Sequence, residues 1–304
     1  MIASGTTLNG LKRQRPEWEP WLAVVEEVLR EAGTSTWNAA VPADDPLSAE
    51  AADAKAATRR TTVPLLAGAT IGLHASSVRR LLERLIHIGS RSGTPKMTSL
   101  AAALRADLDV LTLFTASLCQ DNARTEEVAA ASGADAEALQ AVVALLAVPF
   151  LHACRHRHAS SISESWVEGY CPLCGSWPTF AEVRGIERSR YFRCGRCGGE
   201  WHARTLHCPY CAMSNHHELI ALVPEKGGSH ATIDACNRCR GYVKIFTRLQ
   251  ACPAGTIVLE DLASVELDFA ALEQGYARPA GAGYALDIRV SDTATRRRFF
   301  AWNA

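Results

Sequence analysis

The sequence predicts an α+β protein, with an N-terminal helical bundle, two tandem cysteine-rich ribbons and a C-terminal helix. Apolar residues recur at helical intervals through residues 1–165, as in helices that bury one face. After residue 166 this periodicity gives way to short strand-like runs between glycines and prolines. Four Cys-x-x-Cys pairs lie in that second segment, between residues 171 and 239. We therefore expect a helical domain at 1–165, a first ribbon at 166–206, a second ribbon at 207–252, and a helix with a tail at 253–304.

The helices of the first domain are predicted from stripes of apolar residues and from the residues that interrupt them. Gly33 ends the first stripe, a break near residues 93–95 precedes the third, and Pro149 should kink or divide the fourth. Stripes with this period usually mark the core of a bundle rather than a ligand site. The predicted helical stretches are residues 17–30, 78–88, 104–118 and 137–154.

A closing helix is predicted beyond the ribbons. Leu262, Val265, Phe269 and Leu272 share one helical face, and Gly275 is a suitable residue to follow the helix end. Residues 277–304 contain Gly, Ala and Pro before a basic and aromatic end, so we expect a weakly ordered tail there.

Charge and hydropathy exclude several classes of function. The 304 residues contain 32 basic and 32 acidic side chains, so no overall field attracts a polyanion or an anionic membrane. The basic residues near the start are not followed by the apolar run of a secretory signal, and the apolar stretch 141–151 is too short to span a bilayer. We therefore expect a soluble, cytoplasmic protein whose thiols stay reduced and able to bind a metal.

Eight of the eleven cysteines have the spacing of metal ligands. Two residues between cysteines allow one tight turn to direct both sulfurs to a common point, and two such turns supply the thiolates of a tetrahedral site. The pairs also belong to an internal repeat of turn, hairpin, turn and strand, which favours pairing within each half of the segment. We predict that one ion is bound by Cys171, Cys174, Cys194 and Cys197, and a second ion by Cys208, Cys211, Cys236 and Cys239.

The residues within and after each pair indicate how closely its turn follows the usual metal-binding form. Proline after the first cysteine fixes φ, and glycine after the second cysteine tolerates positive φ. Cys171-Pro-Leu-Cys174-Gly has both, the pair at Cys194 has only the glycine, and the pair at Cys208 has only the proline. Cys236-Asn-Arg-Cys239-Arg has neither, so we expect its turn to be the least typical.

The chemistry of four thiolates is that of a closed coordination shell without an open catalytic position. The sequence also contains no Gly-rich phosphate loop, no His-Glu-x-x-His and no nucleophile elbow, so we expect a protein that is not an enzyme. The ribbons suit zinc as a structural staple, as in a zinc ribbon, or iron in a rubredoxin-like site, because both metals accept four thiolates.

The cysteine segment resembles the FdhE family, the accessory (formation) proteins of formate dehydrogenase. The resemblance rests on Cys171-Pro-Leu-Cys174-Gly-Ser-Trp-Pro178, on the run from Arg190 to His202, on the pairs at Cys208 and Cys236, and on residues 260–268 and 275–276. It extends over roughly residues 15–279. It implies a cytoplasmic, rubredoxin-like maturation chaperone with two tetrathiolate-bound ions, iron being favoured over zinc. It also implies that the partner is the catalytic subunit of formate dehydrogenase, which the family contacts before export.

Two other classes of function fit the same residues. A zinc-ribbon nucleic-acid-binding protein would place basic side chains on phosphates, although the local basic excess is weak. A two-iron, rubredoxin-like electron carrier would use the ions themselves. The basic candidates are Arg188, Arg190, Arg193, Arg196, Arg204, Arg238, Arg240 and Lys244.

For a protein partner, the candidate contacts are Tyr191, Trp201 and Tyr242, because aromatic residues serve as anchors at interfaces. Packing over the small ribbons is the alternative role of these three side chains.

Overall fold

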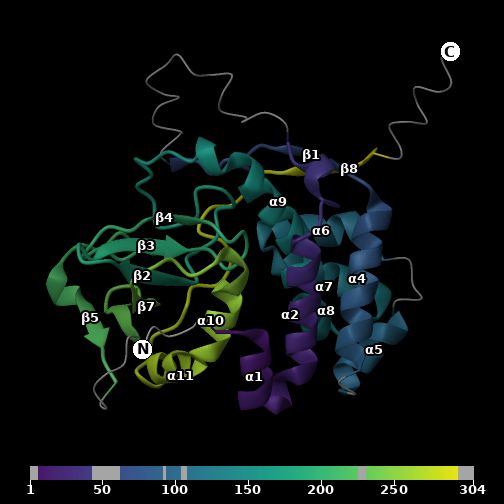
Figure 1. Cartoon of the computed structure of the whole chain (residues 1–304). Coiled ribbons are helices and arrows are strands. Elements are labelled where there is room, and N and C mark those ends of the chain that lie inside the picture. Colours follow the sequence, from purple (N-terminus) through teal and green to yellow (C-terminus); the bar gives the residue numbers. More distant parts are fainter. Residues whose placement is uncertain (1–5, 43–61, 92–93, 104–107, 225–230, 294–304) are drawn as a thin grey trace, which may run out of the picture. The chain divides into compact units, whose positions relative to one another are not determined.

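The computed structural model describes residues 6–42, 62–91, 94–103, 108–224 and 231–293 (Figure 1). These residues form two compact units. The sheet unit holds the described residues of 1–11, 47–65 and 158–285, and the helical unit holds those of 12–46, 66–157 and 286–304. The chain therefore enters each unit more than once, and the division into four domains stays a prediction.

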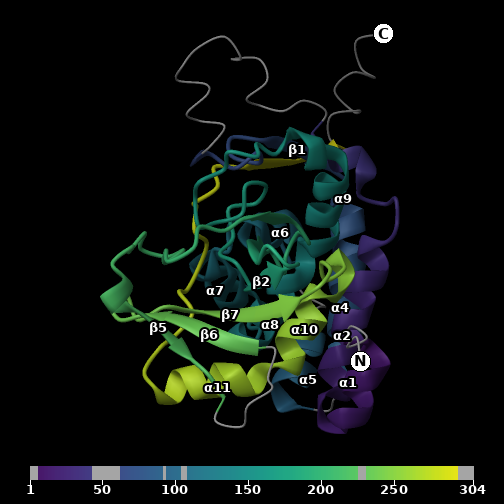
Figure 2. The ribbon, with the colours of Figure 1, turned by 60° about the vertical axis from the view of Figure 1, so that its left-hand side comes forward.

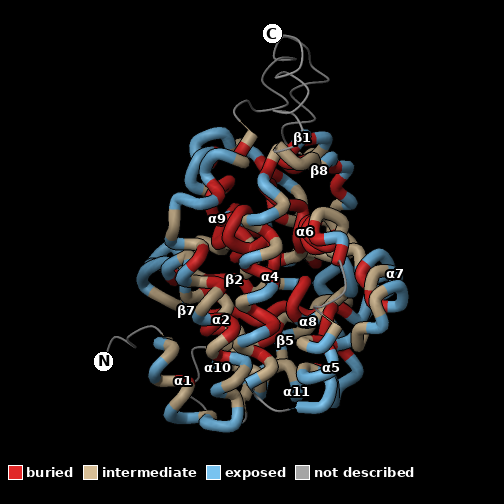
Figure 3. Tube along the Cα trace, turned by 90° about the vertical axis from the view of Figure 1, so that its right-hand side faces the viewer, coloured by how far each residue is buried: buried red, intermediate tan, exposed pale blue. Residues whose placement is uncertain are grey.

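The helical unit has an apolar core that lies along the predicted stripes (Figure 3). Leu22 of α2, Leu85 of α4 and Phe114 of α6 are fully buried, and the Trp37 ring stacks on Phe114 with centroids 5.8 Å apart. Along the chain, the short helix α1 (Leu8–Gln14) spans the division between the two units at residue 11. The helices are α2 (Glu19–Ala32), α4 (Ala75–Ser90), α5 (Pro95–Ala103), α6 (Val110–Cys119), α7 (Asn122–Ser132), α8 (Ala136–Leu146) and α9 (Val148–His158).

Aspartates begin three of these helices. Asp109, Asp121 and Asp135 each accept a hydrogen bond from the backbone N–H three residues later, at the starts of α6, α7 and α8. The cap at Asp109 explains why the third predicted stripe is shorter than expected; Leu104, its predicted first residue, lies outside the described residues. The pattern did not predict α7, because that helix is rich in alanine and buries only Thr125 and Ala129.

The fourth predicted stripe is divided as expected. α8 ends at Leu146, and Pro149 lies in the first turn of α9, where a proline needs no hydrogen-bonding N–H. The stretch Ala136–Ser161 is long and apolar enough to cross a membrane by length and composition, but 72% of its most apolar window is buried inside the protein. A helix in the core of a folded protein is buried to this extent.

The expectation of a weakly ordered tail is wrong for part of it. β8 (Arg289–Asp292) pairs in parallel with β1 (Thr70–Leu73) and forms a small sheet of the helical unit. A four-residue strand carries too short an alternation to stand out from the sequence. Residues 294–304, the rest of the predicted tail, lie outside the described residues.

The sheet unit is built on one six-stranded sheet with strand order β4-β3-β2-β7-β6-β5 (Figures 1 and 2). All neighbouring strands are antiparallel except β2 and β7, which run parallel over five residue pairs. The α+β class is confirmed, but the two ribbons are not separate, because β2 and β7 join them edge to edge. The strands are β2 (Phe180–Arg184), β3 (Ser189–Arg193), β4 (Glu200–His202), β5 (Leu219–Leu222), β6 (Ala231–Cys236) and β7 (Tyr242–Arg248).

The internal repeat is visible in the order of these strands. β2 and β3 form a hairpin around Gly185, and β5 and β6 form the second hairpin, whose turn at 225–230 lies outside the described residues. β4 then follows the turn at Cys194, and β7 follows the turn at Cys236. The strands β2, β3 and β4 of the first half therefore correspond to β5, β6 and β7 of the second half.

The closing helix is two helices, α10 (Ile257–Ala263) and α11 (Val265–Glu273), which lie beside the sheet (Figure 2). The predicted stripe is wrong, because Phe269 and Leu272 are 60% and 54% exposed. Ala271 faces the sheet instead and packs in a cluster with Ile233 and Tyr242. A break at Ser264 shifts the angular position of every later residue, which a single stripe does not take into account.

Buried charges connect the sheet to α10 and α11. The ammonium of Lys244 on β7 is fully buried and lies 2.6 Å from Asp261 Oδ1 and 2.9 Å from Asp268 Oδ2. Arg278 binds the same two carboxylates, and the Tyr242 hydroxyl donates to Asp268 at 2.5 Å. Burial raises the pKa of the Asp268 carboxyl, but Arg278, Tyr242 and Lys244 outweigh burial and leave that pKa lowered.

A second buried network lies where β2, β3 and β7 meet. The Glu182 carboxylate is fully buried and accepts hydrogen bonds from Arg184 and Arg193 at 2.8 Å and from the Cys252 backbone N–H at 2.9 Å. Arg248 of β7 lies 3.6 Å from the same carboxylate. One buried anion therefore neutralises cations from three strands.

We expect Glu182→Gln to lower the free energy of unfolding by about 3 kcal/mol, because the substitution leaves buried guanidinium groups without their anion. The matched control is Glu200→Gln, which removes a 44% exposed partner of Arg184 and Arg193. The control should cost less than about 1 kcal/mol. Urea unfolding of the two variants measures both values, and equal losses would contradict a central role for Glu182.

Stability should also fall in acid. A carboxyl with a lowered folded-state pKa stabilises the protein above its unfolded pKa, and this stabilisation is lost as the pH falls through the folded value. Asp268 and Glu260 both have lowered pKa values, so the loss should occur below about pH 4. Asp268→Asn should flatten the dependence of unfolding free energy on pH between about pH 5 and pH 3, and an unchanged slope in this variant would contradict the role given to Asp268.

Candidate metal centres

The first cysteine quartet lies on the turn before β2 and on the turn between β3 and β4. The Cys171 sulfur is 3.6 Å from that of Cys197, and the Cys174 sulfur is 3.6 Å from that of Cys194. All four sulfurs lie within 4.8 Å of one another, and all four residues are buried. The structure thus brings together the four cysteines that the spacing groups into the first site.

The second quartet has the same internal geometry but is less covered. The Cys208 and Cys239 sulfurs are 3.6 Å apart, those of Cys211 and Cys236 are 3.7 Å apart, and all four lie within 4.8 Å. Cys208 and Cys236 are buried, whereas Cys211 is half-buried and Cys239 is exposed. The two quartets therefore differ in their contact with solvent.

Both quartets fit a tetrahedrally coordinated soft metal. A metal–sulfur bond of about 2.3 Å places the sulfurs of a regular tetrahedron about 3.8 Å apart. The measured separations of 3.6 and 3.7 Å are close to that value, and no disulfide joins these cysteines. Each group is therefore able to bind one ion and would surround it with four sulfurs, which leaves no coordination position for a substrate.

The four turns share one hydrogen-bond pattern. In each turn the N–H four residues after the first cysteine donates to that cysteine's carbonyl, at 2.9 to 3.1 Å. The N–H of the first cysteine donates in turn to the carbonyl five residues later, at 2.8 to 3.0 Å. This pair of bonds closes the loop around the two cysteines and fixes the direction of both sulfurs.

The expectation that the last turn is the least typical is wrong. The residue after the second cysteine has positive φ in every turn: 68° at Gly175, 74° at Gly198, 58° at Ala212 and 58° at Arg240. Alanine and arginine therefore adopt a conformation that glycine adopts without strain. At Arg240 the side chain offers a compensating contact, because its guanidinium donates to the Gln274 and Gly275 carbonyls at the end of α11.

Hydrogen bonds and burial set the acidity of the first quartet. The Cys197 and Gly199 N–H groups point at the sulfurs of Cys194 and Cys197, at 3.5 and 3.4 Å. Burial raises the pKa of Cys171 well above its ordinary value, whereas hydrogen bonds from the Cys171 and Cys194 sulfurs lower that of Cys174. The thiols of Cys171 and Cys174 thus differ in acidity, and a bound cation favours the thiolate form of a cysteine ligand.

The second quartet shows the same division of acidity. Burial raises the pKa of Cys208, and partial burial raises the pKa of Cys239 to about 11. Burial also acts to raise the pKa of Cys236, but backbone N–H groups of Cys239 and Arg238 outweigh it and lower that pKa. Backbone donors in the turn therefore stabilise negative charge on sulfur, as in metal-binding turns generally.

Contacts through Tyr210 connect the two centres. The Tyr210 and Trp177 rings pack edge to face with centroids 5.2 Å apart, and the Tyr210 hydroxyl donates to the Tyr242 carbonyl at 2.7 Å. Gly169, before the first quartet, lies so close to the second that an added Cβ would be 1.9 Å from the Pro209 carbonyl oxygen. Sequence reasoning did not identify these residues, because spacing along the chain carries no signal for contacts between the turns.

The aromatic candidates for partner contact are mostly covered. Trp201 and Tyr242 are 4% and 3% exposed, so they pack within the sheet unit and are wrong as surface anchors. Tyr191 is half-buried, and the Arg184 guanidinium lies over its ring at 4.5 Å.

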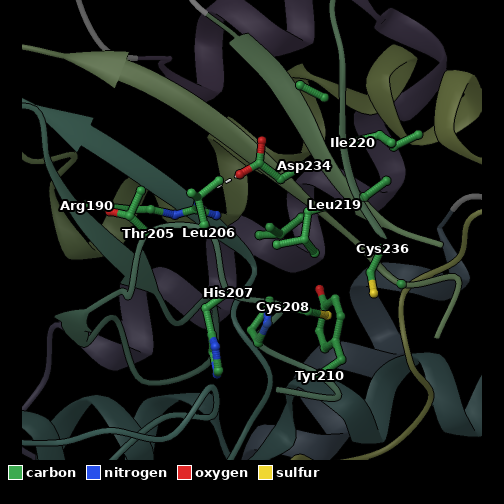
Figure 4. Close-up of a pocket in the computed structure, with 15 residues that line it drawn as sticks. Arg190, Thr205, Leu206, His207, Cys208, Tyr210, Leu219, Ile220, Asp234 and Cys236 are labelled. Carbon is green, nitrogen blue, oxygen red and sulfur yellow. Dashed lines mark hydrogen bonds and ion pairs between the residues drawn. The ribbon is translucent and has the colours of Figure 1, made fainter. Parts of the chain in front are cut away.

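A cavity of about 270 Å³ lies beside the second quartet (Figure 4). Cys208 and Cys236 line one part of it, and an ion pair of 2.6 Å between Arg190 and Asp234 lines another. The remaining wall is largely apolar and comes from β5, β7 and residues 205–210. No motif in the sequence indicates this cavity, because its walls come from distant parts of the segment.

Comparison with known protein families divides the sheet unit at the same place as the repeat. Residues 170–205 match the FdhE central domain, and residues 206–284 match the FdhE C-terminal domain. Each matched domain contains one complete cysteine quartet.

Curated relatives match over the same part of the chain. Protein FdhE of Escherichia coli O127:H6 is 34% identical over 111 residues, which are 36% of this chain and 35% of the relative. The proteins FdhE of Shigella boydii serotype 18 and Escherichia fergusonii are 33% identical over 111 residues, with the same shares. The match thus spans about a third of the length of these relatives.

The crystal structure of the FdhE protein from Pseudomonas aeruginosa is similar over a longer range. It aligns with a TM-score of 0.52 and 24% identity, and covers 91% of this chain and 92% of that chain. This likeness concerns the fold of both units, whereas the domain matches concern the residues that carry the quartets. Residues 170–205 and 206–284 of this chain are therefore an FdhE central domain and an FdhE C-terminal domain.

Proposed function

We propose that this chain is an accessory protein in the formation of formate dehydrogenase, and that two tetrathiolate-bound ions hold its sheet unit in the shape that binds the catalytic subunit. The observation that carries the proposal is the presence of one complete quartet in each FdhE domain. The proposal places the protein in the cytoplasm, where thiols remain reduced. It assigns no reaction to the chain, because four sulfurs complete each coordination shell.

The ions would act mainly through folding. Each half of the sheet has three short strands and a small apolar core, whereas binding of a structural ion to four thiolates supplies on the order of 10 kcal/mol. The resemblance to rubredoxin-like proteins favours iron, which would add one-electron redox chemistry, and zinc would supply the structure alone.

The positions of the basic side chains support a protein partner over nucleic acid. Arg190 pairs with Asp234, Arg193 with Glu182, and Lys244 with Asp261 and Asp268, so these cations are neutralised inside the sheet unit. Arg240 contacts the end of α11. Arg196 also donates to the Ser176 hydroxyl, so five of the eight basic candidates for a nucleic-acid-binding surface are engaged in the fold.

Metal content tests the first part of the proposal. We expect the anaerobically purified chain to contain two thiophilic metal ions, and Cys174→Ser to lower this content to one, because a quartet without one sulfur binds its ion far more weakly. The matched control is Cys252→Ser, since Cys252 is a buried cysteine outside both quartets and should leave the content at two. Elemental analysis gives the count, and the visible spectrum distinguishes iron from zinc; an unchanged count in Cys174→Ser would contradict the assignment.

Binding to the client tests the second part. A tagged catalytic subunit of formate dehydrogenase, taken before export, should retain the wild-type chain and the Cys252→Ser variant in an anaerobic pull-down. Cys174→Ser should be retained much less, because loss of the ion releases the turn before β2. No enrichment of the wild-type chain over an untagged control would count against the proposed function.

A further inference from the structure

Among the described residues of the second half of the sheet, the outer edge of β5 and one face are uncovered, whereas the corresponding edge of β2 and the corresponding face of the first half are covered. β7 pairs with the outer edge of β2, whereas in the described part of the chain no strand pairs with the outer edge of β5, the counterpart of β2. Phe180 and Ile220 occupy equivalent positions, each opposite the residue that precedes a cysteine turn. Phe180 is fully buried and meets the Phe246 ring of β7 at 4.9 Å, but Ile220 is only half-buried.

The open face of this half forms the cavity beside the second quartet, which we call the β5 cleft. α11 covers the opposite face, where Ala271 packs against Ile233 and Ala235. In the first half, Ala181 and Phe192 are buried on the corresponding strands, whereas their counterparts Ala221 and Asp234 are exposed and half-buried. The cleft is lined by Leu206, Tyr210, Leu219, Ala221, Asp234 and Val243, among others.

The lining of the β5 cleft suits an apolar side chain with a polar backbone beside it. Leu206 holds a positive φ of 51° and remains 60% exposed, so a strained residue presents an apolar side chain at the rim. The Arg190–Asp234 ion pair supplies the polar part of the lining, and a carboxylate accepts hydrogen bonds from backbone N–H groups. The volume of about 270 Å³ lies just below the range of about 300–1,000 Å³ for small-molecule pockets, which favours an inserted side chain.

We propose that the β5 cleft binds an extended polypeptide segment of a partner protein, which adds to the free edge of β5 in parallel and inserts one uncharged apolar side chain into the cleft. The parallel direction follows from the repeat, because β7 covers the β2 edge in parallel. Strand addition of this kind takes its affinity from the backbone and its selectivity from alternate side chains. This inference depends on the proposed accessory function in one respect: the partner is taken to be a client polypeptide.

A second copy of the chain is the less suitable occupant. By the repeat, the strand that would add to β5 is the counterpart of β7, which is β4. β4 has three residues, whereas β7 pairs with β2 over five, so β4 is too short to reproduce that pairing. A partner segment has no such restriction of length.

Selection from random peptides tests the proposal directly. The probe is a phage-displayed library of peptides of about ten residues, the length of a long strand, panned on the metal-loaded full chain. We expect enriched peptides with one large apolar residue between β-branched residues and without proline, which removes a strand hydrogen bond. Synthetic copies should bind Leu219→Asp and Ala221→Trp roughly tenfold more weakly than wild type, because these changes place a charge in the cleft or fill it.

The control variant is Ile186→Asp, which changes a fully exposed apolar residue at the β2–β3 turn and should leave peptide affinity within about twofold. All three variants must retain both metal ions, which shows that the sheet unit is intact. Failure to enrich any peptide, or equal binding by wild type and both cleft variants, would overturn the proposal. So would a dimer in sedimentation that Leu219→Asp abolishes, because a second copy would then be the occupant. Peptide binding without client pull-down would reject the proposed function and leave the cleft assignment standing.

Discussion

The parallel pairing of β2 with β7 is the interaction on which the sheet unit depends. Each half of the repeat would otherwise be a three-stranded ribbon with an ion at one end and little apolar core. The pairing joins the halves into one sheet and brings Arg248 of β7 to the buried Glu182 of β2. It also places Phe246 on Phe180, so that apolar and charged contacts act at the same seam. A metal centre at one end of each ribbon would hold its cysteine turns together, and the β2–β7 pairing sets the position of one ribbon relative to the other.

The two buried charge networks make that arrangement specific. A buried carboxylate or ammonium is costly unless it is paired, so a sheet with shifted register would leave Glu182 or Lys244 without a partner. Lys244 binds α10 and α11 through Asp261 and Asp268, whereas Glu182 binds strands from both halves. The residues of both networks and of both quartets lie within the two segments that match FdhE domains.

Local signals in the sequence predict much of this structure, and long-range contacts account for the rest. Cysteine spacing and the repeat are local, and they correctly group the eight sulfurs; runs around Gly185 likewise predict the first hairpin. The β2–β7 pairing joins residues more than sixty positions apart, and no pattern within either strand specifies its neighbour. The turn at Arg240 shows a related limit: the absence of glycine suggests an unusual conformation, but the contact of Arg240 with the end of α11 lies outside the turn. α7 was missed because alanine gives a helix without a stripe.

The two quartets differ in solvent exposure, so ions bound in them would differ in their exposure to oxidants and chelators. The first quartet is enclosed, so an ion once bound there is shielded from oxidants and from competing chelators. In the second quartet, Cys239 reaches solvent, and any thiol-reactive molecule in solution meets this sulfur before the other seven. Oxidation of the protein in air should therefore begin at Cys239 in the second quartet, and the buried first quartet should be oxidised later.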